Sequence, residues 1–311
     1  MKYILLTTLM LGSLLRSDAQ DLGWAAQLGG TLFDHAYAVM TDDSGHVYTT
    51  GSFEGFADLD PGPGFNVFLS SGDADVFVSK LDKDGQMLWA FTFGGNTEDY
   101  GEALSIDAEG NVYVAGYFNG TADFEPGSGT TNLTSDGDYD AFLSKFDADG
   151  NFQWAIRLGG TSADQLRDMA VDTAGNIILA GQFSGTADFD PGAGSLNFTS
   201  AGGNDIFIVK ISEDGELVWA TQFGDNGNDL ARGVAIDSDN NILTTGRFAN
   251  TVDFNPGIGV ANLVSNGMED AFISKISEDA EYVWAVSMGA GLLDEGTAIH
   301  TDAAGRVYTA G

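Results

Sequence analysis

The sequence has no cysteine, only five prolines and few basic residues among its 311 residues. Without cysteine the chain has neither a disulfide framework nor a cysteine for a lipid anchor, so its stability must come from buried area or from closure of the fold. Its 46 acidic and 12 basic residues give a formal net charge of −34. A polyanion of this kind repels nucleic acid and anionic membranes. Because 43% of the residues are hydrophobic, we expect a folded acidic protein rather than a disordered chain.

Long apolar runs are also missing, except at the N-terminus. Lys2 precedes an apolar stretch over residues 3–15, and the small-residue pattern Ser17-Asp18-Ala19 follows it. This order is typical of a secretory signal peptide, predicted over residues 1–19, with the mature protein over 20–311. No later stretch approaches the roughly 18 apolar residues that a membrane helix needs. We therefore expect an exported protein, extracellular or on the cell surface with the periplasm as the alternative, and no membrane insertion.

Tryptophan recurs with a fixed period. The five tryptophans are each 65 residues apart and each is followed by alanine: Trp24, Trp89, Trp154, Trp219 and Trp284. A spacing held over four intervals indicates one supersecondary unit copied in tandem. The predicted units cover residues 24–88, 89–153, 154–218 and 219–283, with a partial fifth unit over 284–311.

Each unit contains about four predicted β-strands. Trp89, Phe91 and Phe93 alternate with small or polar residues, which is the pattern of a strand with one strongly apolar face. The segment 206–211 is apolar on both faces, which predicts a strand covered on both sides. No stretch of the mature chain has a convincing helical period. Four strands per unit, with unit packed against unit, predict an all-β protein and a β-propeller; an open β-solenoid is the alternative.

The predicted turns carry residues that suit them. After the second strand of a unit, Asp107 and Gly110 stand at the first and fourth positions of a type I turn. Asn240 takes the place of the glycine in a later unit, and asparagine tolerates the left-handed conformation. Four of the five prolines occupy one equivalent position, where they break strand pairing: Pro61, Pro126, Pro191 and Pro256.

The motifs that recur over residues 24–311 resemble the SBBP repeat, a β-propeller repeat of secreted bacterial proteins. They are, in the second unit, Gly94-Gly95…Asp99, Asp107…Gly110-Asn111-Val112-Tyr113-Val114-Ala115-Gly116, Asp123-Phe124-Glu125-Pro126-Gly127, and Asp140-Ala141-Phe142…Lys145…Asp149-Gly150…Trp154-Ala155. The resemblance implies a seven-bladed propeller, generally without an assigned biochemical activity. Four units and a partial fifth fall short of seven, so we expect a truncated array, with a five-bladed ring as the alternative.

Acidic residues recur at fixed places and suggest calcium, which takes oxygen ligands. The candidate ligands lie in the linking segment of each unit: Asp58, Asp60, Asp123, Glu125, Asp188, Asp190 and Asp253. The full Asp-x-Asp-x-Asp-Gly loop with its distal Glu never occurs. The interpretation that we favour is that these aspartates order turns by accepting hydrogen bonds from nearby backbone amides.

Catalysis has little support in the sequence. The three histidines, His35, His46 and His300, have no metal-ligand spacing, and there is no nucleophile motif. Paired carboxylates are too frequent here to indicate a glycosidase. We therefore predict no catalytic residues and a protein that is not an enzyme.

Differences between the copies indicate where specificity lies. The segments after Pro-Gly vary most: 65–67, 130–132, 195–197 and 260–262. Variable loops on a fixed scaffold usually carry binding specificity. The sequence therefore favours a secreted or cell-surface scaffold that binds an extracellular polysaccharide or a protein partner. The alternatives are a calcium-stiffened structural spacer and, less favoured, an accessory domain of a polysaccharide-active enzyme.

The tryptophans provide a first prediction. If each indole is buried between units, Trp154→Ala should lower the free energy of unfolding by roughly 3–5 kcal/mol. Denaturant unfolding of the two proteins measures this difference. A loss below about 1 kcal/mol would contradict burial of the ring.

Overall fold

The structure, a computed structural model, describes residues 23–311, so the predicted signal peptide lies outside the described residues. Within that range the chain forms strands connected by turns and contains no helix. This confirms the all-β prediction. The strand pairing is antiparallel apart from one parallel bridge between Glu269 and Leu293.

Most of the strands belong to four consecutive groups of four, which we call sheets 1 to 4. Sheet 1 consists of β2 (Asp34–Thr41), β3 (Val47–Asp58), β4 (Val67–Leu81) and β5 (Met87–Gly95). Sheet 2 consists of β6 (Asp99–Ile106), β7 (Val112–Asp123), β8 (Asn132–Phe146) and β9 (Phe152–Gly160). Sheet 3 consists of β10 (Gln165–Val171), β11 (Ile177–Phe183), β14 (Asp205–Ile211) and β15 (Leu217–Phe223). Sheet 4 consists of β16 (Leu230–Ile236), β17 (Ile242–Phe248), β20 (Asp270–Ile276) and β21 (Tyr282–Met288).

Shorter strands complete the list. In sheet 3 the short strand β12 (Thr186–Asp188) pairs with β13 (Asn197–Thr199) and also with β9 of sheet 2. In sheet 4, β18 (Thr251–Asp253) pairs with β19 (Asn262–Val264) alone. A two-stranded pair, β22 (Ala298–Thr301) and β23 (Val307–Ala310), follows sheet 4, and β1 (Gly29–Gly30) pairs with β3.

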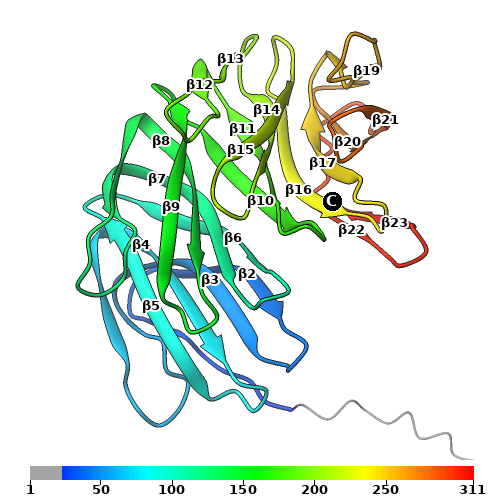
Figure 1. The fold of residues 1–311 in the computed structure, drawn as a ribbon. Coiled ribbons are helices and arrows are strands. Elements are labelled where there is room, and N and C mark those ends of the chain that lie inside the picture. The colour runs from blue at the N-terminus through cyan, green and yellow to red at the C-terminus, as the bar shows by residue number, and fades with distance from the viewer. Residues whose placement is uncertain (1–22) are drawn as a thin grey trace, which may run out of the picture.

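The sheets follow one another around an arc, with the first strand of each on the inside (Figure 1). These first strands contact their neighbours in order: β2 with β6, β6 with β10, β10 with β16, and β16 with β22. The last strand of each sheet, which carries the tryptophan, is the outer edge. This radial arrangement is that of propeller blades. Within the described residues each sheet has two edge strands, and no sheet closes on itself.

The chain passes from the outer strand of sheet 1 to the inner strand of sheet 2 through two glycines. Gly94 and Gly95 at the end of β5 pair with Asp123 and Ala122 in β7, which joins sheets 1 and 2 at this point. A side chain on Gly95 would begin only 2.3 Å from the carbonyl oxygen of Thr121. Glycine is therefore needed here because the two backbones approach closely.

The sheets are offset from the tryptophan spacing. A segment from one tryptophan to the next contains the outer strand of one sheet and three strands of the following sheet. The indole of Trp89 donates a hydrogen bond to the carbonyl of Ala148 at 3.4 Å, and Trp219 does the same to Glu278 at 3.0 Å. Both acceptors lie in the outer hairpin of the next sheet. Because Trp154 is half-buried at this outer rim, the expected cost of Trp154→Ala moves to the lower end of the range, about 3 kcal/mol.

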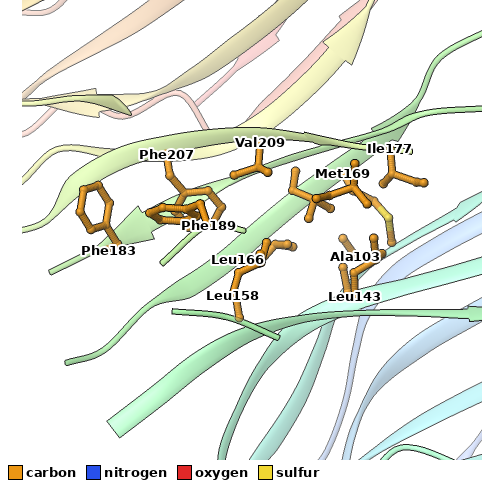
Figure 2. Close-up of a cluster of buried hydrophobic side chains, with 14 of the residues drawn as sticks. Ala103, Leu143, Leu158, Leu166, Met169, Ile177, Phe183, Phe189, Phe207 and Val209 are labelled. Atoms are coloured by element: carbon orange, nitrogen blue, oxygen red, sulfur yellow. The ribbon is translucent and has the colours of Figure 1, made fainter. Parts of the chain in front are cut away.

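The hydrophobic core lies in the spaces between neighbouring sheets. Figure 2 shows the cluster between sheets 2 and 3, where Leu143 and Leu158 face Leu166 and Phe207. The side chains of β14 alternate between this cluster and the next one, since Phe207 and Val209 pack toward sheet 2 whereas Ile206 and Ile208 pack toward sheet 4. This confirms the prediction of a strand covered on both faces.

The turn residues have the conformations that the sequence predicts. Asn240 has a φ of 59°, and Gly110 at the equivalent position has 86°. The outer hairpins use glycine with positive φ, as at Gly215 (84°), except in sheet 4, where Ala280 has a φ of 62°. An alanine in this region is strained because its Cβ approaches the following carbonyl oxygen.

Ala280 provides a second prediction. Ala280→Gly should raise the free energy of unfolding by roughly 0.5–1 kcal/mol, since relief of the left-handed strain exceeds the extra chain entropy of glycine in the unfolded state. The matched control is Gly215→Ala, whose Cβ would begin 3.4 Å from the Trp154 ring, an ordinary contact. Gly215→Ala should lower the free energy of unfolding by a similar amount. Chemical denaturation measures both, and a less stable Ala280→Gly protein would contradict the account.

Two aspartates are buried at each passage between sheets. Asp99 begins β6, is 1% exposed, and accepts a hydrogen bond from the amide of Gly95 at 2.6 Å. Asp75 lies in the buried half of β4 and accepts one from the amide of Ser71 at 2.9 Å. Burial, together with the neighbouring charge of Asp75, raises the pKa of Asp99 to about 8, and burial raises that of Asp75 to about 6. The later junctions repeat this pattern at Asp140, Asp164, Asp205 and Asp229.

The raised pKa values of these carboxylates predict that the stability of the fold depends on pH. A raised pKa means that the folded state holds the proton more tightly than the unfolded state, so stability should increase as the pH falls from 8 toward 4. Further acidification should reverse the trend. Although burial opposes ionisation of Asp42, hydrogen bonds from His46 prevail and lower its pKa to about 2, so its contribution is lost below pH 4.

Thermal unfolding in chelator-treated buffer tests this third prediction. The midpoint should be highest between about pH 4 and pH 6, with each unit of raised pKa worth about 1.4 kcal/mol. Asp99→Asn should reduce the slope between pH 8 and pH 5. A midpoint that rises from pH 5 to pH 8 in the unmodified protein would contradict the effect of burial.

Candidate functional site

Residues that vary between the copies gather where the first strands begin. We call this set the inner-strand cluster; it comprises His35, Tyr37, Tyr100, Glu102, Tyr117, Tyr139, Gln165, Arg167 and Gln182. The position after the recurring aspartate reads His, Tyr, Gln, Leu and Glu in successive copies. The first strands of sheets 1 to 3 carry most of the cluster, and the antiparallel register places Tyr117 beside Tyr100 and Gln182 beside Gln165. The scaffold is thus repeated while this surface is not.

A row of aromatic rings runs through the cluster. On β2, His35 stacks on Tyr37 with ring centroids 5.9 Å apart. Tyr37 meets the edge of Tyr100 at 6.4 Å, across the junction between sheets 1 and 2. Tyr100 lies 5.0 Å from Tyr117, which in turn meets Tyr139 at 5.3 Å. Tyr37 is 42% exposed, so the row begins at the surface and continues into the interior.

Charged and amide groups continue the row toward sheet 3. The guanidinium of Arg167 lies 5.2 Å from the Tyr117 ring centroid and donates to Glu102 at 3.2 Å. Gln165 Oε1 accepts hydrogen bonds from Arg167 at 2.5 Å and from Gln182 at 3.0 Å. Arg167 Nε and Gln182 Oε1 are buried without a partner, although buried polar atoms normally have one.

The ionisation of the cluster favours hydrogen bonding. Burial raises the pKa of Tyr100 to about 12, aided by the nearby charge of Glu98. Burial also raises the pKa of Tyr117 and Tyr139 above the usual range, and Tyr139 donates its hydroxyl hydrogen bond to Glu98. All three phenols are therefore neutral donors at physiological pH. The arrangement combines aromatic faces with neutral hydroxyl, amide and guanidinium donors, which suits the binding of a polar molecule.

A second set of charge pairs extends along sheet 4. Arg232 Nε lies 2.8 Å from Glu295, and Arg247 Nε lies 2.8 Å from Glu269. Arg232 is equivalent to Arg167 in the preceding copy, and Arg247 is equivalent to Tyr117 two copies earlier. The chemistry of this edge therefore changes from aromatic at sheet 1 to ionic at sheet 4.

The calcium candidates lie in the loops between the second and third strands, where their carboxylates accept hydrogen bonds from backbone amides. Asp58 Oδ1 accepts from the amides of Asp60 and Asn66 at 3.1 and 2.9 Å, and Asp60 accepts from Gly62 at 2.8 Å. The equivalent residues Asp123, Asp188, Asp190 and Asp253 do the same, and Glu125 accepts from the Thr131 hydroxyl. Among residues 23–311 no group of three or more His, Asp or Glu is arranged to hold a metal ion. Calcium at these loops stays a prediction.

The variable segments after Pro-Gly are at the surface, as Phe65, 87% exposed, illustrates. They lie in the same loops as the calcium candidates and contribute no residue to the inner-strand cluster. Sequence reasoning did not identify the cluster, because its members are spread over three copies. The sequence feature that could have identified the cluster is the change of residue type directly after the recurring Asp34, Asp99 and Asp164.

Comparisons with known proteins agree with this architecture. Residues 218–247 match the family model described as SBBP, a β-propeller repeat. An uncharacterized WD repeat-containing protein, L264 of Acanthamoeba polyphaga mimivirus, is 26% identical over 235 residues, 67% of this chain and 17% of that protein. The regulatory protein FlaEY of Caulobacter vibrioides is 25% identical over 170 residues, 53% of this chain and 17% of that protein. The chain thus spans about a sixth of the length of either relative.

The matched segment begins in the outer strand β15, includes the inner strand β16 and ends in β17. It thereby contains the tryptophan strand and the passage between sheets 3 and 4. Families with these repeats are typically scaffolds without catalytic activity. Within residues 23–311 the structure has no helix that would cross a membrane. Residues 218–247 carry the SBBP β-propeller repeat, which confirms the resemblance drawn from the motifs.

Proposed function

We propose that the protein is a non-catalytic, exported scaffold whose inner-strand cluster binds an extracellular polysaccharide. The observation that carries this proposal is the row of rings from His35 to Tyr139, continued by Arg167 and Gln165. Ligand sites are typically lined by aromatic side chains with a few placed polar groups. Aromatic faces pack on the apolar face of a sugar ring, and amide and guanidinium groups bond its hydroxyls.

Location and charge support the same ligand class. The predicted signal peptide over residues 1–19 would bring the protein outside the cytoplasm, where polysaccharides are abundant. The net charge of −34 disfavours strongly anionic polymers, so a neutral polysaccharide fits best. A structural spacer is the competing proposal, and it requires no saturable ligand.

Binding measurements on matched variants test the proposal. Neutral polysaccharides are titrated into the protein by calorimetry, and the variants are Tyr37→Ala and Arg167→Gln. We expect each to weaken binding at least tenfold, which corresponds to about 1.4 kcal/mol. The control is Tyr282→Ala, on the outermost strand of sheet 4, where the side chain is 37% exposed. It should bind like the unmodified protein.

A further variant separates the cluster from the loops. Phe65→Ala removes an exposed aromatic side chain from a segment after Pro-Gly. If this change abolishes binding while Tyr37→Ala does not, the loops and not the cluster form the site. Absence of saturable binding to any neutral polysaccharide would contradict the proposal and favour the spacer.

A further inference from the structure

The aspartate pairs buried between sheets include carboxylate oxygens that have no hydrogen-bond or cationic partner within residues 23–311. Oδ1 of Asp75 and Oδ1 of Asp99 are both buried without a hydrogen-bond partner. The corresponding Oδ1 atom is also unpartnered in each later copy of Asp75, namely Asp140, Asp205 and Asp270. A buried carboxylate oxygen without a partner is costly, so a recurring one indicates a missing ligand.

At the first two junctions the two carboxylates of a pair converge on one place. Asp75 Oδ1 and Asp99 Oδ2 lie 2.7 and 2.8 Å from the point where a side chain on Gly94 would begin. Asp140 Oδ1 and Asp164 Oδ2 both lie 2.9 Å from the same point on Gly159. The glycine leaves both carboxylates room to approach each other from adjoining sheets.

One junction contains its own cation. Between sheets 2 and 3, Arg157 Nη1 lies 2.5 Å from Asp140 Oδ2 and 2.7 Å from Asp136 Oδ2. The equivalent residue is Thr92 in sheet 1 and Gln222 in sheet 3. No ion pair of the described residues includes Asp75, Asp99, Asp205 or Asp229. One carboxylate of the pair, Asp140, is therefore ion-paired with a guanidinium at this junction, whereas its counterparts Asp75 and Asp205 have no cationic side chain.

We propose that the Asp75–Asp99 junction binds one divalent cation, which supplies there the positive charge that Arg157 supplies at the next junction. Two carboxylates of opposite sheets match the charge of a divalent ion, and calcium accepts such oxygen ligands together with carbonyls and water. An ion held by both sheets stabilises their packing, because it removes repulsion between two buried charges. This site is separate from the loop carboxylates such as Asp58 and does not depend on polysaccharide binding.

Calcium binding by the full chain tests the proposal. Equilibrium dialysis of chelator-treated protein against CaCl₂ in 150 mM NaCl, which screens the general surface charge, should give one tightly bound ion per chain. Thr92→Arg introduces the guanidinium at the first junction and should leave no bound ion. Arg157→Thr removes it at the second junction and should give two. Asp58→Asn, in the loop, should leave the number at one.

Thermal unfolding provides a second readout on the same variants. Calcium should raise the midpoint of the unmodified protein, and this rise should be smaller in Thr92→Arg and larger in Arg157→Thr. Two results would overturn the proposal. One is the absence of saturable calcium binding below millimolar concentrations, which would mean that protons neutralise the pairs. The other is a number of bound ions that Thr92→Arg and Arg157→Thr leave unchanged.

Discussion

The hydrogen bond from a backbone amide to the buried aspartate four residues later fixes each passage between sheets. Gly95 donates to Asp99 at 2.6 Å, and Gly160 donates to Asp164 at 2.7 Å. The bond sets the direction in which the chain leaves the outer strand of one sheet and enters the inner strand of the next. It also buries a carboxylate beside a second one, as Asp99 lies beside Asp75. The expected pH dependence and the proposed cation site both follow from this burial.

Repetition and variation have separate roles in this molecule. The recurring residues, such as Gly94, Asp99 and Trp89, build the junctions and the outer rim. The copies vary at the position directly after the recurring aspartate, where the side chain is exposed or partly exposed in every copy except Leu230. Tyr100 and Gln165 occupy this position in adjoining sheets. A ligand that spans two or three sheets would meet a different side chain from each, which is how a repetitive scaffold acquires a single binding surface.

The strands and turns were predictable from the sequence, whereas the sheet to which each strand belongs was not. Alternation at Trp89, Phe91 and Phe93 and the apolar segment 206–211 are local patterns, and they identified strands and their covered faces. The tryptophan spacing gave the length of the repeat but not the residue at which each sheet begins. The sheet that a strand joins depends on long-range pairing. The aspartates were assigned to turns, which is right for Asp58 but overlooks Asp75 and Asp99. Their pairing joins residues 24 positions apart in different sheets, and the sequence alone does not bring them together.

The carboxyl carbon resonance of Asp99, followed by NMR as a function of pH, tests the central role of the buried aspartates most directly. Selective ¹³C labelling of aspartate and comparison with Asp99→Asn assign the signal. In buffer freed of divalent cations the account predicts a titration midpoint near 8 for Asp99, far above the ordinary value of about 4 for an exposed aspartate. A midpoint near 4 would mean that the carboxylate is solvated and that the junction does not enclose it, which would contradict the account.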